Sequence, residues 1–277
     1  MTRPTLITPF RHRSGRRRSA EAGLVSLVGA GTSSDQLTLG AVKALKEADV
    51  VLYDALVADD VTAFMSRGAT AIYTGKRCGQ HALTQAQINA LLVSYGQQGL
   101  NVVRLKAGDP FIFGRGSEEV EALRAAGIGY RVLPGVSALN GVAANFALPL
   151  TTRGKGAEFR AIQGHRLPDD ESYWQDLARY SGTIVIFMGS EKWQTIVGRL
   201  LSAGKAPSTP YAVIETSSDG TQHVHRGVLL TADSSPFRRR HGGPAIIYIG
   251  ENVSLMDSQL PDSSRSRNDK SRAAGRV

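Results

Sequence analysis

A pair of glycines followed by an aspartate is the first feature of the sequence suited to binding a ligand. Gly29-Ala30-Gly31 follows an apolar run, and Asp54 ends the next apolar run. This spacing is most of a dinucleotide-binding fingerprint, in which glycines form the tight turn and an acid binds the ribose. Ser34 replaces the third glycine of that fingerprint. Two interpretations stay open: a nicotinamide-binding turn, or glycines that only turn the chain.

A second glycine-rich segment, residues 106–116, reads Lys-Ala-Gly-Asp-Pro-Phe-Ile-Phe-Gly-Arg-Gly and also follows an apolar run. Its glycines flank Asp109-Pro110, which leaves backbone amides and carbonyls exposed where a flat polar ligand can lie. Its apolar residues are unusual for a solvated loop. The alternative is a glycine-rich turn in which Asp109 caps the following helix.

Two cations and an imidazole lie in a third segment, residues 75–81, which is bounded by glycines. Lys76, Arg77 and His81 follow a predicted strand, and Asp54 ends the strand before it. A carboxylate and an ammonium group at one sheet edge can shift each other's pKa and share acid–base work. Adjacent charges are also typical of a solvated face, and these residues alone do not separate the two interpretations.

Several reaction classes lack the motifs that they need. The sequence has no Gly-x-Ser-x-Gly nucleophile elbow, no Walker Gly-Lys-Ser/Thr and no His-Glu-x-x-His zinc pattern. Its single cysteine, Cys78, excludes an intramolecular disulfide framework and a cysteine-clustered metal site. These absences argue against a hydrolase and a nucleotide kinase, and we expect no metal.

Short apolar runs alternate with helical patterns in the first half of the chain. The runs cover residues 24–28, 50–53, 71–74, 102–105 and 130–133, as expected of strands buried on both faces of a parallel sheet. Apolar residues at helical spacing between them predict helices that end near Asp49, Gly96 and Gly127. This alternation predicts an α/β fold, in which ligands bind beyond the carboxyl ends of the strands.

The pattern changes after Pro134-Gly135, where we place a domain boundary. Helices at 137–147 and 193–203 and strands at 159–163, 183–188, 211–214 and 245–249 predict a second α/β unit. The alternation at His223-Val224-His225 indicates an antiparallel pair in a mixed sheet. The predicted organisation is a disordered basic tail (1–22), an N-terminal α/β domain (23–134), a C-terminal α/β domain (135–257) and a disordered tail (258–277).

The net charge of +9 is concentrated in the two tails. Residues 1–22 hold six Arg and one Glu, residues 258–277 hold five Lys or Arg and two Asp, and the body between them has a net charge of +1. A nearly neutral body does not favour nucleic acid or an anionic membrane, so we expect neither partner. No apolar run approaches the roughly 18 residues that span a bilayer. The sequence also shows no secretory signal, so we expect a cytoplasmic protein.

Six motifs, in this order along the chain, resemble those of one family. They are Val28-Gly-Ala-Gly31, Tyr53-Asp54-x-Leu56-Val57, Gly75-Lys-Arg-x-Gly-x-His81, Gln87-Ile-Asn89, the segment 104–116 and Val132-Leu-Pro-Gly135. Together they resemble the uroporphyrinogen-III C-methyltransferases of the tetrapyrrole methylase superfamily. The resemblance covers about residues 24–257 and continues through Arg153, Gly164-His165 and Met188-Gly189.

This resemblance implies the tetrapyrrole methylase fold: two α/β domains with S-adenosylmethionine bound in the cleft between them, usually in a homodimer. The implied reaction methylates C2 and then C7 of uroporphyrinogen III, giving precorrin-2 for siroheme or cobalamin synthesis, with S-adenosylhomocysteine as the second product. Asp54 carries over as the proton acceptor and Lys76 as the proton donor. Cofactor contacts carry over to Ala107, Gly108, Asp109, Ile112, Ser137, Ala138 and Met188.

The implied substrate carries eight carboxylates, so cationic side chains should line the cleft. Arginine suits carboxylate geometry best, because its guanidinium binds both oxygens at once. Our hypothesis is that Arg77, Arg115 and Arg153 bind the substrate.

Three departures from the family pattern concern the cofactor. Thr32 stands in a shortened loop where the family has a proline, Ala107 replaces a glycine, and Ser217 replaces a glycine that approaches the cofactor. Ala107 is tolerated only if its φ is negative. A non-catalytic or altered-specificity homologue that binds the cofactor is therefore the first alternative. A nicotinamide dehydrogenase and an RNA-binding role of the tails are the others.

Overall fold

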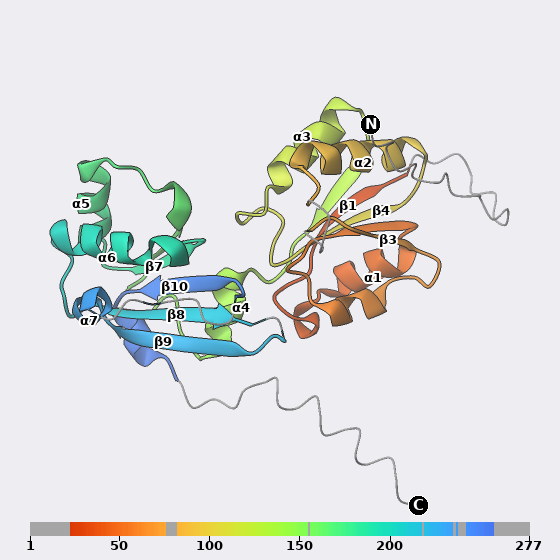
Figure 1. The fold of residues 1–277 in the computed structure, drawn as a ribbon. Helices are drawn as coiled ribbons and strands as arrows, with labels where there is room; N and C mark the ends of the chain where they lie inside the picture. The colour runs from red at the N-terminus through yellow and green to blue at the C-terminus, as the bar shows by residue number, and fades with distance from the viewer. Residues whose placement is uncertain are drawn as a thin grey trace, which may run out of the picture.

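Two β-sheets, each covered by helices, form two lobes that lie side by side (Figure 1). The structure is a computed structural model, and it describes residues 23–75, 82–154, 156–217, 219–234, 237 and 242–257. The predicted α/β class is confirmed. Within the described part of the chain, no helix combines the length and the apolar character that crossing a membrane requires.

The first sheet consists of five parallel strands in the order β3-β2-β4-β1-β5. They are β1 (Val25–Gly29), β2 (Val50–Tyr53), β3 (Thr70–Tyr73), β4 (Val102–Lys106) and β5 (Tyr130–Leu133). All five strands expected in the first half of the chain are therefore present. Because they run parallel, their carboxyl ends lie along one edge of the sheet.

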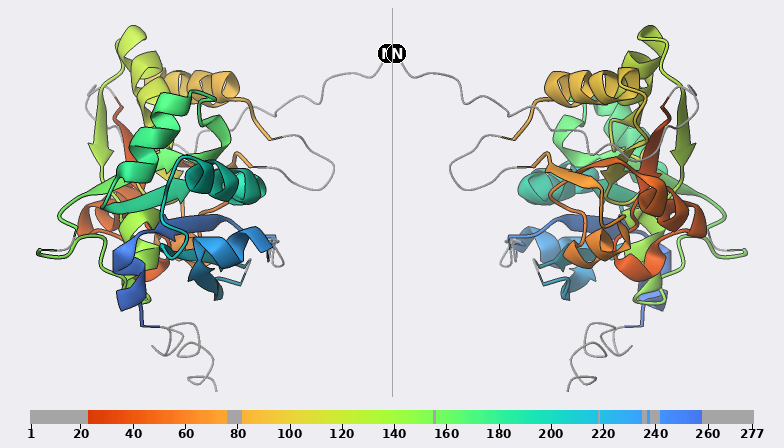
Figure 2. Two further views of the ribbon diagram at one scale, coloured as in Figure 1. Left: turned by 90° about the vertical axis from the view of Figure 1, so that its left-hand side faces the viewer. Right: turned by 90° about the vertical axis from the view of Figure 1, so that its right-hand side faces the viewer.

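Helices cover both faces of this sheet. Helix α1 (Leu39–Glu47) packs on one face, whereas α2 (Gln85–Gln97) and α3 (Gly116–Ala125) lie side by side on the other (Figures 1 and 2). Helix α2 begins with a capping box, in which Thr84 and Gln87 satisfy each other's backbone amides. Successive residues of each strand face alternate cores, and this explains why the strands are apolar on both sides.

The second sheet is mixed and has the order β6-β7-β10-β8-β9. Its strands are β6 (Phe159–Gln163), β7 (Thr183–Phe187), β8 (Pro210–Thr216), β9 (Gln222–Val228) and β10 (Ala245–Ile249). Only β6 and β7 pair in parallel, and the other neighbours are antiparallel. The antiparallel strand expected around residues 223–225 is confirmed as β9.

Four helices pack on the second sheet. Helix α4 (Ala138–Ala144) covers one face, and α5 (Glu171–Arg179), α6 (Trp193–Ser202) and α7 (Leu229–Ser234) cover the other. The sequence patterns predict α4 and α6 but not α5 or α7. Helix α5 is mostly polar on its exposed side and buries Trp174, Leu177 and Ala178 at helical spacing, so the sequence does contain a signal for this helix.

The loop after β4 reaches from the first lobe to the second. The ring of Phe113 lies 4.9 Å from the ring of Phe187, measured between centroids, at the end of β7. Helix α4, which follows β5 directly, is fixed to the second sheet by Tyr248, whose hydroxyl donates to the carbonyl of Ala138 at 3.1 Å. The ends of β4, β5 and β7 therefore meet where the two lobes join.

Glycines bring the ends of β1, β4 and β5 into backbone contact. Gly31 and Gly108 form an isolated bridge, with N–H···O distances of 2.8 and 3.2 Å. A Cβ on Gly29 would lie 2.4 Å from the amide nitrogen of Gly135, and a Cβ on Gly135 would lie 2.2 Å from the carbonyl oxygen of Gly108. No side chain fits between these backbones. The glycine at the end of β1, Gly29, therefore serves close packing of the strand ends.

We expect Gly135→Ala to lower the free energy of unfolding by about 3 kcal/mol, because the new methyl group must push two strand ends apart. Gly129→Ala is the matched control, since its Cβ would meet nothing closer than 4.0 Å. Urea denaturation measures both. An unchanged midpoint for Gly135→Ala would show that the strand ends are not packed as described.

Candidate active site

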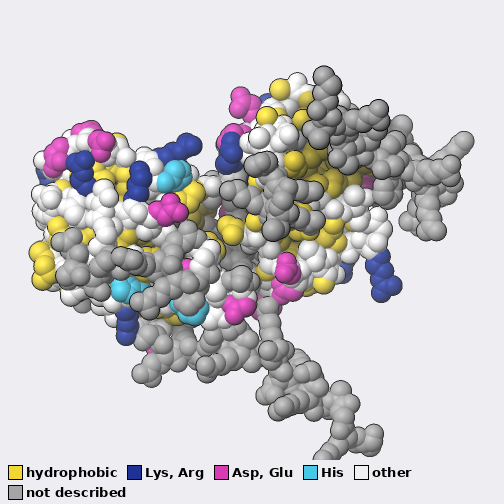
Figure 3. Space-filling view, in the orientation of Figure 1, with side chains coloured by type: hydrophobic (Ala, Val, Ile, Leu, Met, Phe, Trp, Pro, Cys, Tyr) yellow, Lys and Arg dark blue, Asp and Glu magenta, His cyan; other side chains and the backbone are white. Residues whose placement is uncertain are grey.

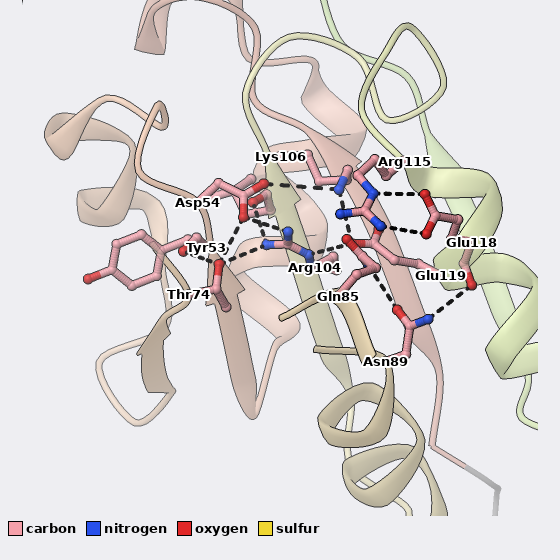
Figure 4. A network of polar contacts seen from close by, with 11 residues as sticks. Tyr53, Asp54, Thr74, Gln85, Asn89, Arg104, Lys106, Arg115, Glu118 and Glu119 are labelled. Carbon is pink, nitrogen blue, oxygen red and sulfur yellow. Dashed lines mark hydrogen bonds and ion pairs between the residues drawn. The ribbon is translucent and has the colours of Figure 1, made fainter. Parts of the chain in front are cut away.

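Asp54 lies where three strand ends meet. It directly follows β2, which pairs with β3 on one side and with β4 on the other. Thr74 follows β3 and Arg104 lies within β4, so both side chains reach the Asp54 carboxylate (Figure 4). Thr74 Oγ1 donates to Oδ1 of Asp54 at 2.8 Å, and Nη2 of Arg104 donates to the same oxygen at 2.5 Å.

Arg104 connects Asp54 to a second carboxylate, Glu119 of α3. Nε of Arg104 and Nζ of Lys106 donate to Oε1 of Glu119 at 2.9 and 3.0 Å, and Gln85 of α2 donates at 3.3 Å. The exposed fraction is 2% for Arg104, 3% for Lys106 and 0% for Glu119. We call Asp54, Arg104, Lys106 and Glu119 the buried charge cluster. Its two positive and two negative groups balance each other, and Asp54, whose side chain is 32% exposed, is the member that reaches solvent.

The pKa values of the two cations shift in opposite directions, although burial disfavours the charged form of both. Burial, followed by repulsion from Arg104, lowers the pKa of Lys106 despite its attraction to Glu119 and Asp54. Burial also disfavours the charged form of Arg104, but the two carboxylates together raise its pKa. Oε2 of Glu119 is buried and has no hydrogen-bond partner among the described residues. Glu119 is therefore held through its Oε1 alone among the described residues. Removing Arg104 or Lys106 would leave the buried charge of Glu119 incompletely paired.

Asp109 shapes the loop after β4 and ties it to β5. Its Oδ1 accepts from the amide of Phe111 at 2.8 Å, and its Oδ2 accepts from the amide of Gly135 at 3.1 Å. The alternative in which Asp109 caps α3 is wrong, because no side chain caps the start of that helix. Gly108 has a φ of 67°, whereas Ala107 is not among the residues with positive φ. The condition for an alanine at position 107 is thus met.

Arg115 lies beside the buried charge cluster at the start of α3 (Figure 4). Its φ of 60° is unusual for a residue with a side chain. Its guanidinium binds both carboxylate oxygens of Glu118 at 2.7 Å. This bond lowers the pKa of Glu118, and Arg166 of the second lobe contributes to the same shift. Positive charge from both lobes therefore favours the ionised form of Glu118.

The other residues assigned to the cofactor surround the same loop from both lobes. A Cβ on Gly108 would lie 3.6 Å from the amide nitrogen of Ala138. Ser137 is buried, and its Oγ caps α4. Ile112 and Met188 are apolar yet 36% and 45% exposed, and Met188 has a φ of 53°. Exposed apolar side chains next to backbone polar groups are typical of small-molecule sites.

The three arginines proposed for the substrate have different positions. Arg115 adjoins the cluster, whereas Arg77, like Lys76, lies outside the described residues. Arg153 lies on an exposed turn before β6, and among the described residues no ion pair or hydrogen bond joins it to the buried charge cluster. In the space-filling view a notch separates the two lobes, and Lys or Arg side chains lie on both of its walls (Figure 3).

Local hydrogen bonds hold two of the residues that depart from the family pattern, Thr32 and Ser217. The amide and the hydroxyl of Thr32 both donate to Oε1 of Gln36 at 2.8 Å, so Gln36 closes the shortened loop after β1. Ser217 lies in the turn between β8 and β9, where its hydroxyl donates to Asp219 at 2.5 Å.

Sequence reasoning missed Arg104, Glu119 and Thr74 as site residues. A signal for Arg104 exists, because it is the one charged residue in an otherwise apolar run, 102–105. A charge at the centre of a buried strand needs a partner. Nothing in the sequence identifies Glu119 as that partner, since Glu118 and Glu121 lie on the same helix.

A family model described as Tetrapyrrole (Corrin/Porphyrin) Methylases matches residues 24–233. The chain belongs to the tetrapyrrole methylases. The predicted family, its fold and the prediction of a methyltransferase are confirmed.

Relatives of this tetrapyrrole methylase include siroheme synthases and solved methyltransferases. The siroheme synthase of Edwardsiella ictaluri is 41% identical over 236 residues, which are 85% of this chain and 51% of that protein. Siroheme synthase 1 of Pectobacterium atrosepticum is 44% identical over 239 residues, 86% of this chain and 49% of that protein. The chain thus spans about half the length of these curated relatives.

The uroporphyrin-III C-methyltransferase of Thermus thermophilus, solved in complex with S-adenosylhomocysteine, is 36% identical and has a TM-score of 0.70. It aligns over 84% of this chain and 100% of its own. A cobalt precorrin-4 methyltransferase is 27% identical, with a TM-score of 0.70 over 83% of this chain and 95% of its own.

We expect Lys106→Met to weaken the pH dependence of stability in this tetrapyrrole methylase. The pKa of Lys106 is lowered from 10.5 in the folded protein, so the unfolded chain binds the proton more tightly. The free energy of unfolding then rises as the pH increases toward 10.5, by up to ~1.4 kcal/mol per pH unit. Urea denaturation between pH 7 and about 10.5 measures this slope. Equal slopes in the variant and the wild type would contradict the burial of the ammonium group. Lys43→Met, at an exposed position of α1, is the control.

Proposed function

We propose that this tetrapyrrole methylase transfers methyl groups from S-adenosylmethionine to C2 and then C7 of uroporphyrinogen III, giving precorrin-2 and S-adenosylhomocysteine. The observation that carries this proposal is Asp54, a carboxylate fixed by a buried arginine at the sheet edge that also bears the glycine-lined loop. The 36% identical Thermus structure with S-adenosylhomocysteine supports the choice of cofactor.

The residues around the loop after β4 fit an adenosine-bearing cofactor. The backbone of Gly108 lies close to the start of α4, where a Cβ would be 3.6 Å from the amide nitrogen of Ala138, and the exposed apolar side chains of Ile112 and Met188 can cover a flat base. Each oxygen of Asp109 accepts one hydrogen bond from a backbone amide and keeps a further lone pair for a ligand hydroxyl or amine. These residues, with Ala107, Ser137 and Ala138, would hold the cofactor.

When bound, S-adenosylmethionine supplies an electrophilic methyl group. A pyrrole carbon of the electron-rich porphyrinogen is already nucleophilic, so the protein needs no covalent nucleophile. It must align the reacting atoms, which is worth up to roughly 7–11 kcal/mol, and it must handle protons of the macrocycle. We assign Asp54 as the proton acceptor and Lys76 as the proton donor.

Cationic side chains at the notch between the lobes suit the carboxylates of the substrate. Arg115 binds Glu118 at the exposed start of α3, and Arg77 and Arg153 complete the proposed set. An arriving carboxylate can take over the guanidinium of Arg115 from Glu118, because that ion pair is exposed. The relatives named siroheme synthase favour siroheme synthesis as the pathway. A cytoplasmic homodimer remains our prediction.

We expect Asp54→Asn and Asp54→Ala to lower methyl transfer by about 10²–10⁴-fold, the usual contribution of a positioned acid–base group. Transfer of labelled methyl from S-adenosylmethionine to uroporphyrinogen III measures this. Asp176→Asn, on α5 of the second lobe, is the control for removing a carboxylate elsewhere.

The methyl-transfer assay, together with measurements of cofactor binding, tests the alternative functions. A wild-type protein that binds S-adenosylmethionine and transfers no methyl group would support a non-catalytic homologue. Enhanced NADH fluorescence on mixing would support a dehydrogenase instead. Transfer to another tetrapyrrole, with none to uroporphyrinogen III, would show altered specificity.

Arg115→Ala should raise KM for uroporphyrinogen III by about tenfold, because a charge-assisted hydrogen bond is lost. Steady-state kinetics at saturating S-adenosylmethionine measures it. Arg124→Ala removes an exposed arginine from the other end of α3 and should leave KM unchanged. If Arg115→Ala has no effect on KM, Arg115 does not bind substrate.

A further inference from the structure

The two oxygens of the Asp54 carboxylate have different surroundings. Oδ1 accepts hydrogen bonds from Nη2 of Arg104 at 2.5 Å and from Oγ1 of Thr74 at 2.8 Å. Among the described residues, Oδ2 forms an ion pair with Nζ of Lys106 at 4.0 Å, which is too far for a hydrogen bond. The Asp54 side chain is 32% exposed although Arg104 is 2% exposed. The carboxylate therefore projects from a closed cluster toward solvent, with Oδ2 as its less engaged oxygen.

Arg104 is itself held in one orientation. Its planar guanidinium donates from Nε to Glu119 and from Nη2 to Asp54. It therefore fixes the position of one carboxylate relative to the other. Nη1 lies 3.5 Å from Thr74 Oγ1 and from a backbone carbonyl of β4. Glu119 cannot move aside, because it is completely buried and also accepts from Lys106 and Gln85. A residue of α3 thus sets the orientation of Asp54.

We propose that Oδ2 of Asp54 is the atom that accepts the proton in methyl transfer, and that Arg104, held by Glu119, is a positioning residue that turns this oxygen toward the macrocycle. This inference rests on the proposed function. The pyrrole carbon forms its new bond to the methyl group with its own electron pair, while the bond between that methyl group and the cofactor sulfur breaks and leaves its electron pair on the sulfur. A C–H bond of the macrocycle then breaks, its electron pair stays in the ring system, and its proton goes to Oδ2. Oδ1 keeps both of its donors throughout, so the carboxylate does not need to turn.

A double-mutant cycle tests whether Arg104 acts through Asp54. Arg104→Lys keeps the charge and loses the planar fork, and we expect kcat to fall on the order of 10²-fold with both KM values within about twofold of wild type. In an Asp54→Ala background, Arg104→Lys should have almost no further effect on kcat. Additive losses, or a wild-type kcat for Arg104→Lys, would overturn the inference. Arg131→Lys is the matched control, since among the described residues Arg131 bonds a neutral hydroxyl, that of Ser26 on the same sheet, and no carboxylate.

A milder pair of variants covers the case in which Arg104→Lys does not fold. Thr74→Val removes the second donor to Oδ1 while keeping the shape of the side chain, and Thr74→Ser restores the hydroxyl. We expect kcat to fall about tenfold for the valine variant and to recover for the serine variant. Equal kcat values for the two would contradict the positioning role.

Crystal structures of the wild type and of Arg104→Lys separate this inference from the proposed function. We expect the Asp54 carboxylate to be rotated in the variant. An unchanged carboxylate would overturn the positioning role whether or not the protein methylates uroporphyrinogen III. A wild type without methyl transfer but with a rotated carboxylate in the variant would overturn only the assignment of Oδ2 as proton acceptor, together with the proposed function.

Discussion

The buried charge cluster is the constraint on which the rest of the first lobe depends. Removing a charged group from water costs several kcal/mol even after relaxation, and Arg104, Lys106 and Glu119 are all at most 3% exposed. Their pairing repays that cost only if β4 and α3 keep their register, because each hydrogen bond joins a side chain of one to a side chain of the other. The strand order, the position of α3 and the direction of Asp54 are thus parts of one arrangement.

The strand ends add a second constraint, which is steric. Gly29 and Gly135 allow three backbones to meet where no Cβ fits, and Asp109 ties the loop after β4 to β5. The same loop reaches the second lobe through Phe113 and Phe187. A rigid polar edge therefore faces a second lobe that contributes apolar and cationic side chains, and this combination suits a nucleoside cofactor and a polyanionic substrate.

Much of this fold could be predicted from the sequence, because its strands are short apolar runs that end at Gly, Asp or Pro. Asp54 could be recognised by its place at a strand end. Glu119 could not, because its pairing with Arg104 depends on how α3 packs on the sheet, and local pattern does not determine that. The positive φ of Arg115 and Met188 is equally invisible in their side-chain types. Helix α5 was predictable in principle, because Trp174, Leu177 and Ala178 recur at helical spacing behind the N-cap Asp170.

The crystal structure of the complex with S-adenosylhomocysteine is the measurement that tests this account most directly. The account predicts the nucleoside between the loop after β4 and the start of α4, in contact with Gly108, Ile112 and Met188. It also predicts that the sulfur faces the notch between the lobes and that Oδ1 of Asp54 still accepts from Arg104. A ligand bound elsewhere, or an Asp54 carboxylate detached from Arg104 in the complex, would contradict it.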